Sequence, residues 1–369
     1  FKHIPKPEFN NLGMSFGECH IEGTEVLTKS EGWVDFRNLT ENSLVATFDD
    51  NREIFFEKPS ALQQKEFSGN MIKISNQKNL AIITPNHRIA YYNKNDGYTE
   101  LKYEFAKDHV FSNSNLMMPV STGISIKNEL EQSKHLTALD KLKIAIQADG
   151  CIRYWRNAKG ERFRRGSSTN SQSYEIKFTK KRKIDRLKNI LHELPNVHYT
   201  EHVDGRGYTA FDIHLDKTFN YKTFDWVLAK DVLTKDWCRG FVAELSHWDG
   251  HYLPYKKKCK IKYSSTSKAC ADIAQMIGLL AGYRTHIVTS VDNRSETFND
   301  CFTVSFTQHL GVVSGNSYKK EDYKYEGVVY CATMSTGNLI TRYKNKVLFS
   351  GNSEVRHSEA YSELLTVLG

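Results

Sequence analysis

Short runs in which apolar and polar residues alternate fill the two outer parts of the chain. Residues 53–56 and 71–75 are two such runs, and Asn, Asp and Gly separate them from neighbouring runs. Alternation of this kind is typical of β-strands, and the separating residues favour turns. The same pattern returns over residues 325–349. We therefore predict one β-rich body, formed by residues 19–120 and 317–352, whose two ends can come together.

The middle of the chain follows a different pattern. Apolar residues recur at helical spacing over residues 136–148 and again over residues 236–247. Each stretch leads into an Asp-Gly pair, Asp149-Gly150 in the first case and Asp249-Gly250 in the second. Residues 121–316 are therefore predicted to form an inserted domain with helices.

This insertion has a duplicated layout. A further helix is predicted in each half, over residues 180–194 and 267–281, after basic stretches that resemble strands. The halves, about 135–230 and 231–316, share this order of elements with little sequence identity. The predicted fold class is mixed α and β: an all-β body interrupted by an α+β domain with pseudo-twofold symmetry.

Composition narrows the class of protein. The chain has 369 residues, enough for more than one domain core, and its net charge of +8 comes from many charges of both signs. Its seven cysteines include no Cys-x-x-Cys pair, which argues against a zinc site or a disulfide framework. The sequence has no pattern typical of a signal peptide or a membrane span. We expect a cytoplasmic protein with reduced thiols and no membrane partner.

Nucleophilic side chains stand at both ends of the β-rich body. The Cys19 thiolate can attack the carbonyl of Glu18 and convert that amide into a thioester, which divides one difficult step into easier ones. The Ser353 hydroxyl can then accept the acyl group. The side-chain amide of Asn352 can attack its own carbonyl, which closes a succinimide and cuts the chain before Ser353. These residues are placed to excise residues 19–352 and to join the flanks.

Four stretches, in the same order along the chain, resemble the splicing motifs of inteins and related Hint domains. They are residues 19–28 followed by Gly32-Trp33, the run from Thr84 to His87, residues 329–338, and residues 347–353. The resemblance implies a horseshoe-like all-β splicing domain that needs no cofactor. It also implies that Thr84 and His87 assist the first acyl shift, with His87 protonating the departing amide nitrogen of Cys19.

The last two stretches depart from the commonest intein pattern. Gly351 stands where a penultimate histidine is usual, and Asn338 stands where another histidine often lies. Cys331 occupies the usual position of an aspartate, so it is a candidate acid, base or secondary nucleophile, with an ordinary buried cysteine as the alternative. Because Cys19 is present, we assign initiation to it. The departures leave one rival open, a DNA endonuclease whose splicing is defunct or limited to cleavage of the ends.

The inserted domain resembles a two-repeat LAGLIDADG homing endonuclease, through residues 142–150 and 241–250. The resemblance implies that two packed helices bring Asp149 and Asp249 to the centre of a pseudo-twofold site. There the carboxylates would hold Mg²⁺ over the scissile phosphates of double-stranded DNA. The internal symmetry implies a monomer. The second copy departs from the family pattern at His247-Trp248, where small residues usually permit close helix packing.

Basic residues follow both Asp-Gly motifs and are the predicted contacts with DNA. Lysine and arginine neutralise phosphates, and arginine on a strand can read base edges in the major groove. A solvated charged face is the alternative interpretation. Lys268 resembles the lysine that this family places at the catalytic centre. The candidate DNA-binding residues are Arg153, Arg156, Arg162, Arg164, Arg165, Lys256, Lys257, Lys258 and Lys260.

The two flanks, residues 1–18 and 353–369, resemble part of the ribonucleotide reductase small (β) subunit. Glu354 and His357 have the Glu-x-x-His spacing that places both side chains on one helix face in di-iron bundles. The resemblance implies that they bind iron only in the complete, spliced host. The motifs together predict an intein that splices itself out of this host and carries a site-specific DNA endonuclease.

Overall fold

The computed structural model divides the chain into two compact units. Among the described residues, unit 1 consists of residues 18–28, 34–119 and 313–352, and unit 2 of residues 29–33 and 120–312. Unit 2 thus ends at Val312, where strand β21 (Val312–Ser314) begins and pairs with β10 (Leu116–Pro119); the end predicted for the insertion is residue 316. The structure describes residues 18–123, 135–152, 154–156, 162–164, 171–216, 219–220, 223–255, 258–291 and 299–352; within 153–171 and 252–260 it describes the backbone alone.

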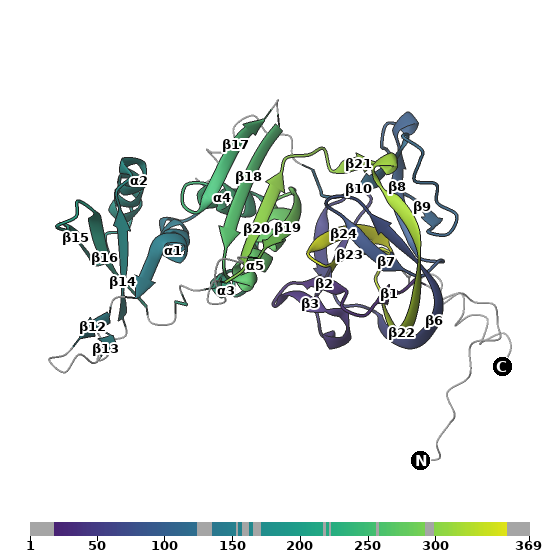
Figure 1. Ribbon diagram of the computed structural model, residues 1–369, viewed down its shortest axis with the longest axis horizontal. Coiled ribbons are helices and arrows are strands. Elements are labelled where there is room, and N and C mark those ends of the chain that lie inside the picture. Colours follow the sequence, from purple (N-terminus) through teal and green to yellow (C-terminus); the bar gives the residue numbers. More distant parts are fainter. Residues whose placement is uncertain are drawn as a thin grey trace, which may run out of the picture. The chain divides into compact units, whose positions relative to one another are not determined.

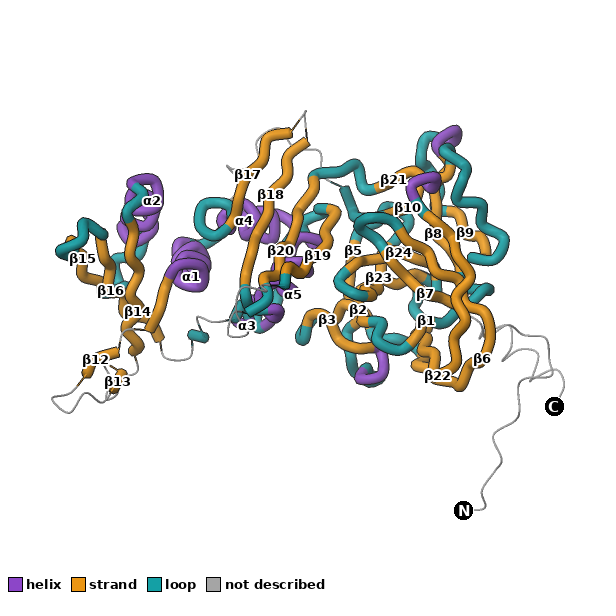
Figure 2. The backbone as a smooth tube through the Cα atoms, viewed as in Figure 1, coloured by secondary structure: helices purple, strands orange, loops and turns teal. Residues whose placement is uncertain are grey.

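Unit 1 is a body of antiparallel strands with no long helix among its described residues (Figures 1 and 2). Besides β10 and β21, its strands are β1 (His20–Ile21), β2 (Glu25–Thr28), β3 (Gly32–Asp35), β4 (Val45–Phe48), β5 (Ile54–Glu57), β6 (Ala61–Ser75), β7 (Leu80–Ile83), β8 (Arg88–Asn93), β9 (Lys102–Phe105), β22 (Lys319–Thr333), β23 (Asn338–Tyr343) and β24 (Lys346–Gly351).

Four of these strands close into a barrel in the order β1, β22, β6, β7. The long strands β6 and β22 pair along their whole length, from Ala61 opposite Thr333 to Ser75 opposite Lys319. Strand β1 pairs with both β22 and β7, so the start of the β-rich body lies beside a strand that follows the insertion. The register therefore brings the two outer parts of the chain together.

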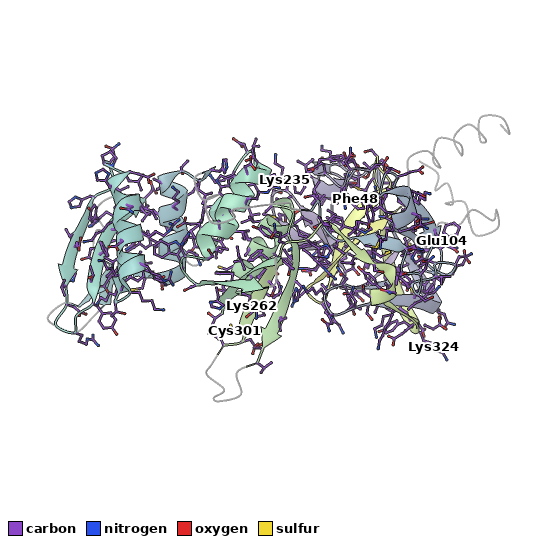
Figure 3. All side chains as sticks on the ribbon, turned by 90° about the horizontal axis from the view of Figure 1, so that it is seen from above. Phe48, Glu104, Lys235, Lys262, Cys301 and Lys324 are labelled. Carbon is purple, nitrogen blue, oxygen red and sulfur yellow. The ribbon has the colours of Figure 1, made fainter. Side chains whose placement is uncertain are left out.

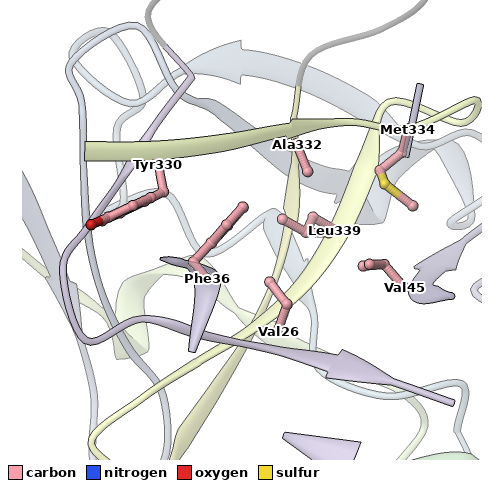
Figure 4. Close-up of a cluster of buried hydrophobic side chains, with 7 residues drawn as sticks. All are labelled: Val26, Phe36, Val45, Tyr330, Ala332, Met334 and Leu339. Carbon is pink, nitrogen blue, oxygen red and sulfur yellow. The ribbon is translucent and has the colours of Figure 1, made fainter. Parts of the chain in front are cut away.

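Apolar side chains from both outer parts pack in common clusters inside unit 1. One cluster consists of Val26, Phe36, Val45, Tyr330, Ala332, Met334 and Leu339 (Figure 4). A second cluster consists of Cys19, Ile21, Met71, Ile82, Val329 and Cys331. Burial of apolar surface is the main force that stabilises such a body. Phe48 is fully buried, whereas the Glu104 side chain is partly exposed; both are labelled in Figure 3.

Unit 2 combines helices with antiparallel sheets and repeats one layout twice (Figures 1 and 2). Its first half contains α1 (Ala138–Asp149), β11 (Gly150–Ile152), β12 (Tyr154–Arg156), β13 (Arg162–Arg164), β14 (Ser171–Phe178), α2 (Lys181–His192), β15 (Tyr199–Val203), β16 (Thr209–Asp216) and α3 (Asp225–Leu228). Its second half contains α4 (Lys235–Leu245), β17 (Gly250–Tyr255), β18 (Lys258–Ser265), α5 (Lys268–Leu280), β19 (Arg284–Ser290) and β20 (Cys301–Thr307).

Local capping explains where the paired helices begin. The Thr137 hydroxyl accepts from the Asp140 N–H at the start of α1, and the Thr234 hydroxyl accepts from the Trp237 N–H at the start of α4. The strands of the two halves form sheets in the orders β11, β14, β16, β15 and β17, β18, β20, β19. The mixed fold class and its duplicated inserted domain are thus confirmed. No described helix is long and apolar enough to span a membrane.

Candidate functional site

Cys19 is buried directly ahead of β1, with 3% of its surface exposed. Its N–H donates to the Thr84 hydroxyl at 2.9 Å, and the Thr84 N–H donates to the Cys19 carbonyl at 3.0 Å. Thr84 follows the last residue of β7, and His20 of β1 pairs with Ile83 of β7. Strand pairing therefore positions the hydroxyl on the amide nitrogen of the Glu18-Cys19 bond.

His87 completes the same buried site. Its N–H donates to the Thr84 carbonyl at 3.0 Å in a turn, and its ring meets that of His20 edge-on with centroids 4.6 Å apart. Burial lowers the pKa of His20 to about 3. Burial also lowers the pKa of His87 well below its ordinary value, as do the charges of His20 and Arg88, while the Glu18 backbone raises it. A protonated His87 would therefore be a strong acid beside the Glu18 carbonyl.

Cys331 connects the two ends of the excisable segment. A hydrogen bond from the Cys331 side chain lowers the pKa of the Cys19 thiol, and the Lys65 charge adds to this effect, while burial and the Glu18 charge oppose it. The Cys331 thiol also donates to Asn352 Oδ1 at 3.4 Å. A thiol carries one proton, so it can donate to only one of these partners at a time. The structure thus brings Cys19, Cys331 and Asn352 into one site.

Asn352 is fully buried and held at three atoms. Its side-chain Nδ2 donates to the Ala332 carbonyl at 2.7 Å, and its N–H donates to the Gly337 carbonyl at 2.6 Å. Its Oδ1 accepts from Cys331. Such contacts fix the side-chain amide relative to the main chain that it would attack. Ser353, Glu354 and His357 lie outside the described residues.

The absence of a histidine at position 351 has a steric explanation. A Cβ atom at Gly351 would lie 2.8 Å from Cβ of Arg88 and 2.9 Å from Cδ1 of Tyr103, so any side chain there would require both residues to move. Asn338 is opposite Gly351 in the β23–β24 pair. Its Oδ1 accepts from the Tyr103 hydroxyl at 2.8 Å, and its Nδ2 donates to the Phe48 carbonyl at 2.9 Å. Sequence analysis missed Arg88 and Tyr103, although Arg88 directly follows the Thr84–His87 motif.

Unit 2 brings the two Asp-Gly pairs together. Near the starts of α1 and α4, the Trp237 indole N–H donates to Asp140 Oδ2 at 2.9 Å, so the helices are in contact there. At the other ends, the negative charge of Asp149 acts on Asp249. Burial, followed by this charge, raises the pKa of the Asp249 carboxyl to about 6, and the charge of Lys183 opposes the rise.

Both glycines of the pairs permit close backbone approach. A Cβ at Gly150 would lie 2.6 Å from the Ile146 carbonyl oxygen, and one at Gly250 would lie 2.4 Å from that of Leu245. The second helix ends at Leu245, ahead of the acidic residue, whereas α1 ends at Asp149 itself. The backbone leading to Asp149 is therefore helical up to that residue, whereas the backbone leading to Asp249 leaves the helix earlier.

The bulky pair His247-Trp248 is accommodated at the junction of the repeats. Trp248 is 3% exposed, and its indole N–H donates to Glu244 Oε1 at 2.8 Å. The buried Glu244 carboxylate also forms an ion pair with Arg186 of α2. Arg182 of α2 donates to the His247 carbonyl at 2.9 Å. These contacts tie α2 of the first repeat to the end of α4 in the second.

Among the residues with described side chains, Lys183 forms an ion pair with Asp149 of the carboxylate pair. The Lys183 ammonium lies 2.5 Å from Asp149 Oδ2, with 9% of its side chain exposed. Lys268 instead pairs with Asp272, four residues later on α5. The sequence could have indicated Lys183. It lies near the start of α2, the helix after β14, and Lys268 lies at the start of α5, the equivalent helix after β18.

A bound cation would relieve the repulsion between the Asp149 and Asp249 carboxylates, but two carboxylates alone do not form a complete set of metal ligands. Among the described residues, no group of three or more His, Cys, Asp and Glu side chains could hold a metal ion. Oxygens from phosphate and water would have to supply the remaining ligands. The predicted DNA contacts cannot be placed as side chains. Arg153, Arg165, Lys256 and Lys257 lie outside the described residues, and Arg156, Arg162, Arg164, Lys258 and Lys260 have described backbone only.

Comparison with known proteins returns the kinds of protein that the motifs resemble. No family model matches the chain. The chain is 33% identical to the ribonucleoside-diphosphate reductase subunit beta of Aquifex aeolicus over 91% of its own length and 50% of that protein. It thus spans about half the length of this curated relative. The flanks make up less than a tenth of the chain, so the match runs through the segment between Cys19 and Asn352.

The comparison with solved structures returns an intein and homing endonucleases. One is a class 3 split intein, AceL NrdHF, with 15% identity, 54% of this chain and 99% of that chain covered, and a TM-score of 0.24. Another is the homing endonuclease I-DmoI in complex with its target DNA and magnesium, with 11% identity, 48% and 91% covered, and a TM-score of 0.31. The neighbours that the comparison returns thus include both an intein and a homing endonuclease, the two kinds of protein that the motifs resemble.

Proposed function

We propose that residues 19–352 are an intein that splices itself out of a ribonucleotide reductase β-subunit host. Cys19 Sγ attacks the Glu18 carbonyl carbon, the carbon–nitrogen bond breaks, and the Cys19 nitrogen takes up a proton. Thr84 holds that nitrogen and His87 supplies the proton. The hydrogen bond from Cys331 favours the thiolate form of Cys19, which is the attacking species.

The later steps use the other end of the segment. Ser353 Oγ attacks the thioester and releases the Cys19 thiol, whose proton is restored. Asn352 Nδ2 then attacks its own carbonyl carbon, which releases the Ser353 nitrogen and leaves a succinimide. The freed amine takes the acyl group from Ser353 Oγ, so a normal peptide bond joins Glu18 to Ser353. Asn352 Nδ2 loses one proton in its attack on the carbonyl carbon, and the Ser353 nitrogen gains one. Cys331 contacts Asn352 Oδ1 and can assist by making the Nδ2 protons more acidic.

The observation that carries this proposal is that both Cys19 and Asn352 contact Cys331, which shares a buried apolar cluster with Cys19. An Asn352→Ala chain blocks the last cleavage and retains an ester or thioester at Glu18. Hydroxylamine cuts such bonds but not amides, so it should release residues 1–18. A Cys19→Ala, Asn352→Ala chain should release nothing, and equal release from both chains would refute the mechanism.

We further propose that unit 2 is a site-specific endonuclease for double-stranded DNA. Asp149 and Asp249 would hold divalent cations such as Mg²⁺, which would neutralise charge and activate water at the scissile phosphates when bound. Their mutual repulsion supports this assignment. Lys183 would balance the charge of Asp149 between reactions. The basic residues after each motif would contact phosphates, and the spliced host would use Glu354 and His357 for iron.

The duplex that encodes the joined flanks, without the insertion, is the substrate with which to test nuclease function. Cleavage that requires Mg²⁺ and disappears in Asp149→Asn and Asp249→Asn chains would support it. Cleavage without any splicing would favour the rival interpretation, an endonuclease whose splicing domain is defunct. The departures at Gly351 and Asn338 are the observations behind that rival.

A further inference from the structure

Arg88 forms a buried ion pair with the residue on the host side of the first scissile bond. Its Nε lies 2.9 Å from Glu18 Oε1, and the two side chains are only 12% and 11% exposed. Glu18 leaves the segment during splicing, whereas Arg88 stays. Arg88 directly follows His87 and begins β8, so it is positioned by the same turn that positions the predicted acid.

Further contacts hold the Arg88 guanidinium in place. Its Nη2 donates to the Gly337 carbonyl at 3.2 Å, and that carbonyl also accepts from the Asn352 N–H at 2.6 Å. Its Cζ lies 5.1 Å from the centre of the Tyr103 ring. A guanidinium fixed in this way offers a prepared position for a carboxylate. The prepared partner is a host residue and not part of the segment itself.

We propose that Arg88 determines specificity for an acidic host residue immediately before the insertion. This inference rests on the proposed splicing function and deepens it. A buried guanidinium that loses its carboxylate partner loses a charge-assisted interaction, and a lysine at position 18 would add repulsion. The ion pair also restrains the Glu18 side chain directly before the scissile bond. The host sites that this segment can occupy are therefore those with Glu, or a comparable carboxylate, before it.

The test measures hydroxylamine release of residues 1–18 from chains that carry Asn352→Ala. Glu18→Gln should slow the release by about tenfold, because the buried guanidinium loses the negative charge with which it forms its ion pair. In an Arg88→Gln chain, release should be slow both with Glu18 and with Glu18→Gln, with the two rates equal within about twofold. Glu22→Gln is the matched control, because Glu22 pairs with Arg37 at 3.0 Å with both side chains 51% exposed; it should leave the rate unchanged.

The outcomes separate the two proposals. Two results would overturn the specificity role and leave splicing intact. One is that the Glu18→Gln chain releases residues 1–18 as fast as the chain with Glu18. The other is that Glu18→Gln still slows the release by about tenfold when Arg88→Gln is also present. No release from any chain with Cys19 would overturn the splicing function and the specificity role with it. If Arg88→Gln does not fold, Arg88→Lys replaces it; a lysine keeps the charge, so the Glu preference should shrink but keep its direction.

Discussion

The Cys331 thiol lies 3.4 Å from the Asn352 side-chain oxygen, and the same thiol hydrogen-bonds Cys19. A strand that follows the insertion therefore carries one group that contacts both reacting ends. In the proposed splicing reaction, this position would let one thiol proton serve the first step and then the last. Cys331 and Cys19 are buried in the same cluster.

Replacement of Cys331 should impair the last cleavage. In a Cys19→Ala chain, which cannot begin splicing, Cys331→Ala should slow cleavage after Asn352 by roughly tenfold, because the hydrogen bond to Oδ1 is lost. The rate is measured by the appearance of free residues 353–369. Cys238→Ala, another fully buried cysteine, is the control and should have no effect on this rate. An unchanged rate in Cys331→Ala would show that the cysteine is structural.

Replacement of Thr84 should impair the first step. Thr84→Val keeps the shape but removes the hydroxyl that accepts from the Cys19 N–H at 2.9 Å. Thioester formation should slow by about tenfold to a hundredfold, as followed by hydroxylamine release in an Asn352→Ala background. Thr24→Val is the matched control, because the Thr24 hydroxyl is also buried and has no hydrogen-bond partner among the described residues. Equal rates for both variants would contradict the role given to Thr84.

The buried histidines predict how the stability of unit 1 depends on pH. The pKa of His20 is about 3 in the folded chain, and that of His87 is also lowered, against about 6.5 when unfolded. Below pH 6.5 the unfolded chain therefore binds protons that the folded chain does not, and the free energy of unfolding falls as pH falls. Each histidine contributes about 1.4 kcal/mol per pH unit in this range.

Urea unfolding of Cys19→Ala chains at pH 7.5 and pH 5 measures this dependence. His20→Gln should reduce the loss of stability between these conditions by about 2 kcal/mol. His202→Gln, at an exposed position, should leave the loss unchanged. The same loss in all three chains would contradict the assignment of His20 as a neutral buried group.

The carboxylate pair predicts a proton-linked response of unit 2 to Mg²⁺. The pKa of Asp249 is raised to about 6 by burial and by Asp149, so its charged form costs stability above that pH. Millimolar Mg²⁺ should raise the thermal transition of unit 2 at pH 7.5 more than at pH 5.5, since protons compete with the cation. Asp249→Asn should abolish the response, and Asp236→Asn, on the outside of α4, should not. A response that persists in Asp249→Asn would move the cation elsewhere.

The sequence alone was sufficient to predict those candidate residues whose chemistry is distinctive. Cys19, Asn352 and the two Asp-Gly pairs stand at the ends of predictable elements, and alternation or helical spacing located those elements. The duplicated layout followed in the same way, because a repeated order of helices and strands is visible along one dimension.

Contacts that depend on strand register and on close packing could not be predicted from the sequence. Lys183 meets Asp149 only because α2 packs beside α1, while the basic runs of the chain offered many equivalent lysines. Arg88 reaches Glu18 through strand pairing between parts far apart in sequence. Gly351 departs from the commonest intein motif, and only the folded structure shows that Arg88 and Tyr103 fill the space beside it.

Intact mass spectrometry of the chain after incubation in reductant is the decisive experiment for self-splicing. We expect two products: residues 1–18 joined to residues 353–369, and a free segment of residues 19–352 that ends in a succinimide. Cys19→Ala and Asn352→Ala chains should not give the joined product. An unchanged chain, or separate flanks with no joined product, would contradict self-splicing and leave the endonuclease as the function to pursue.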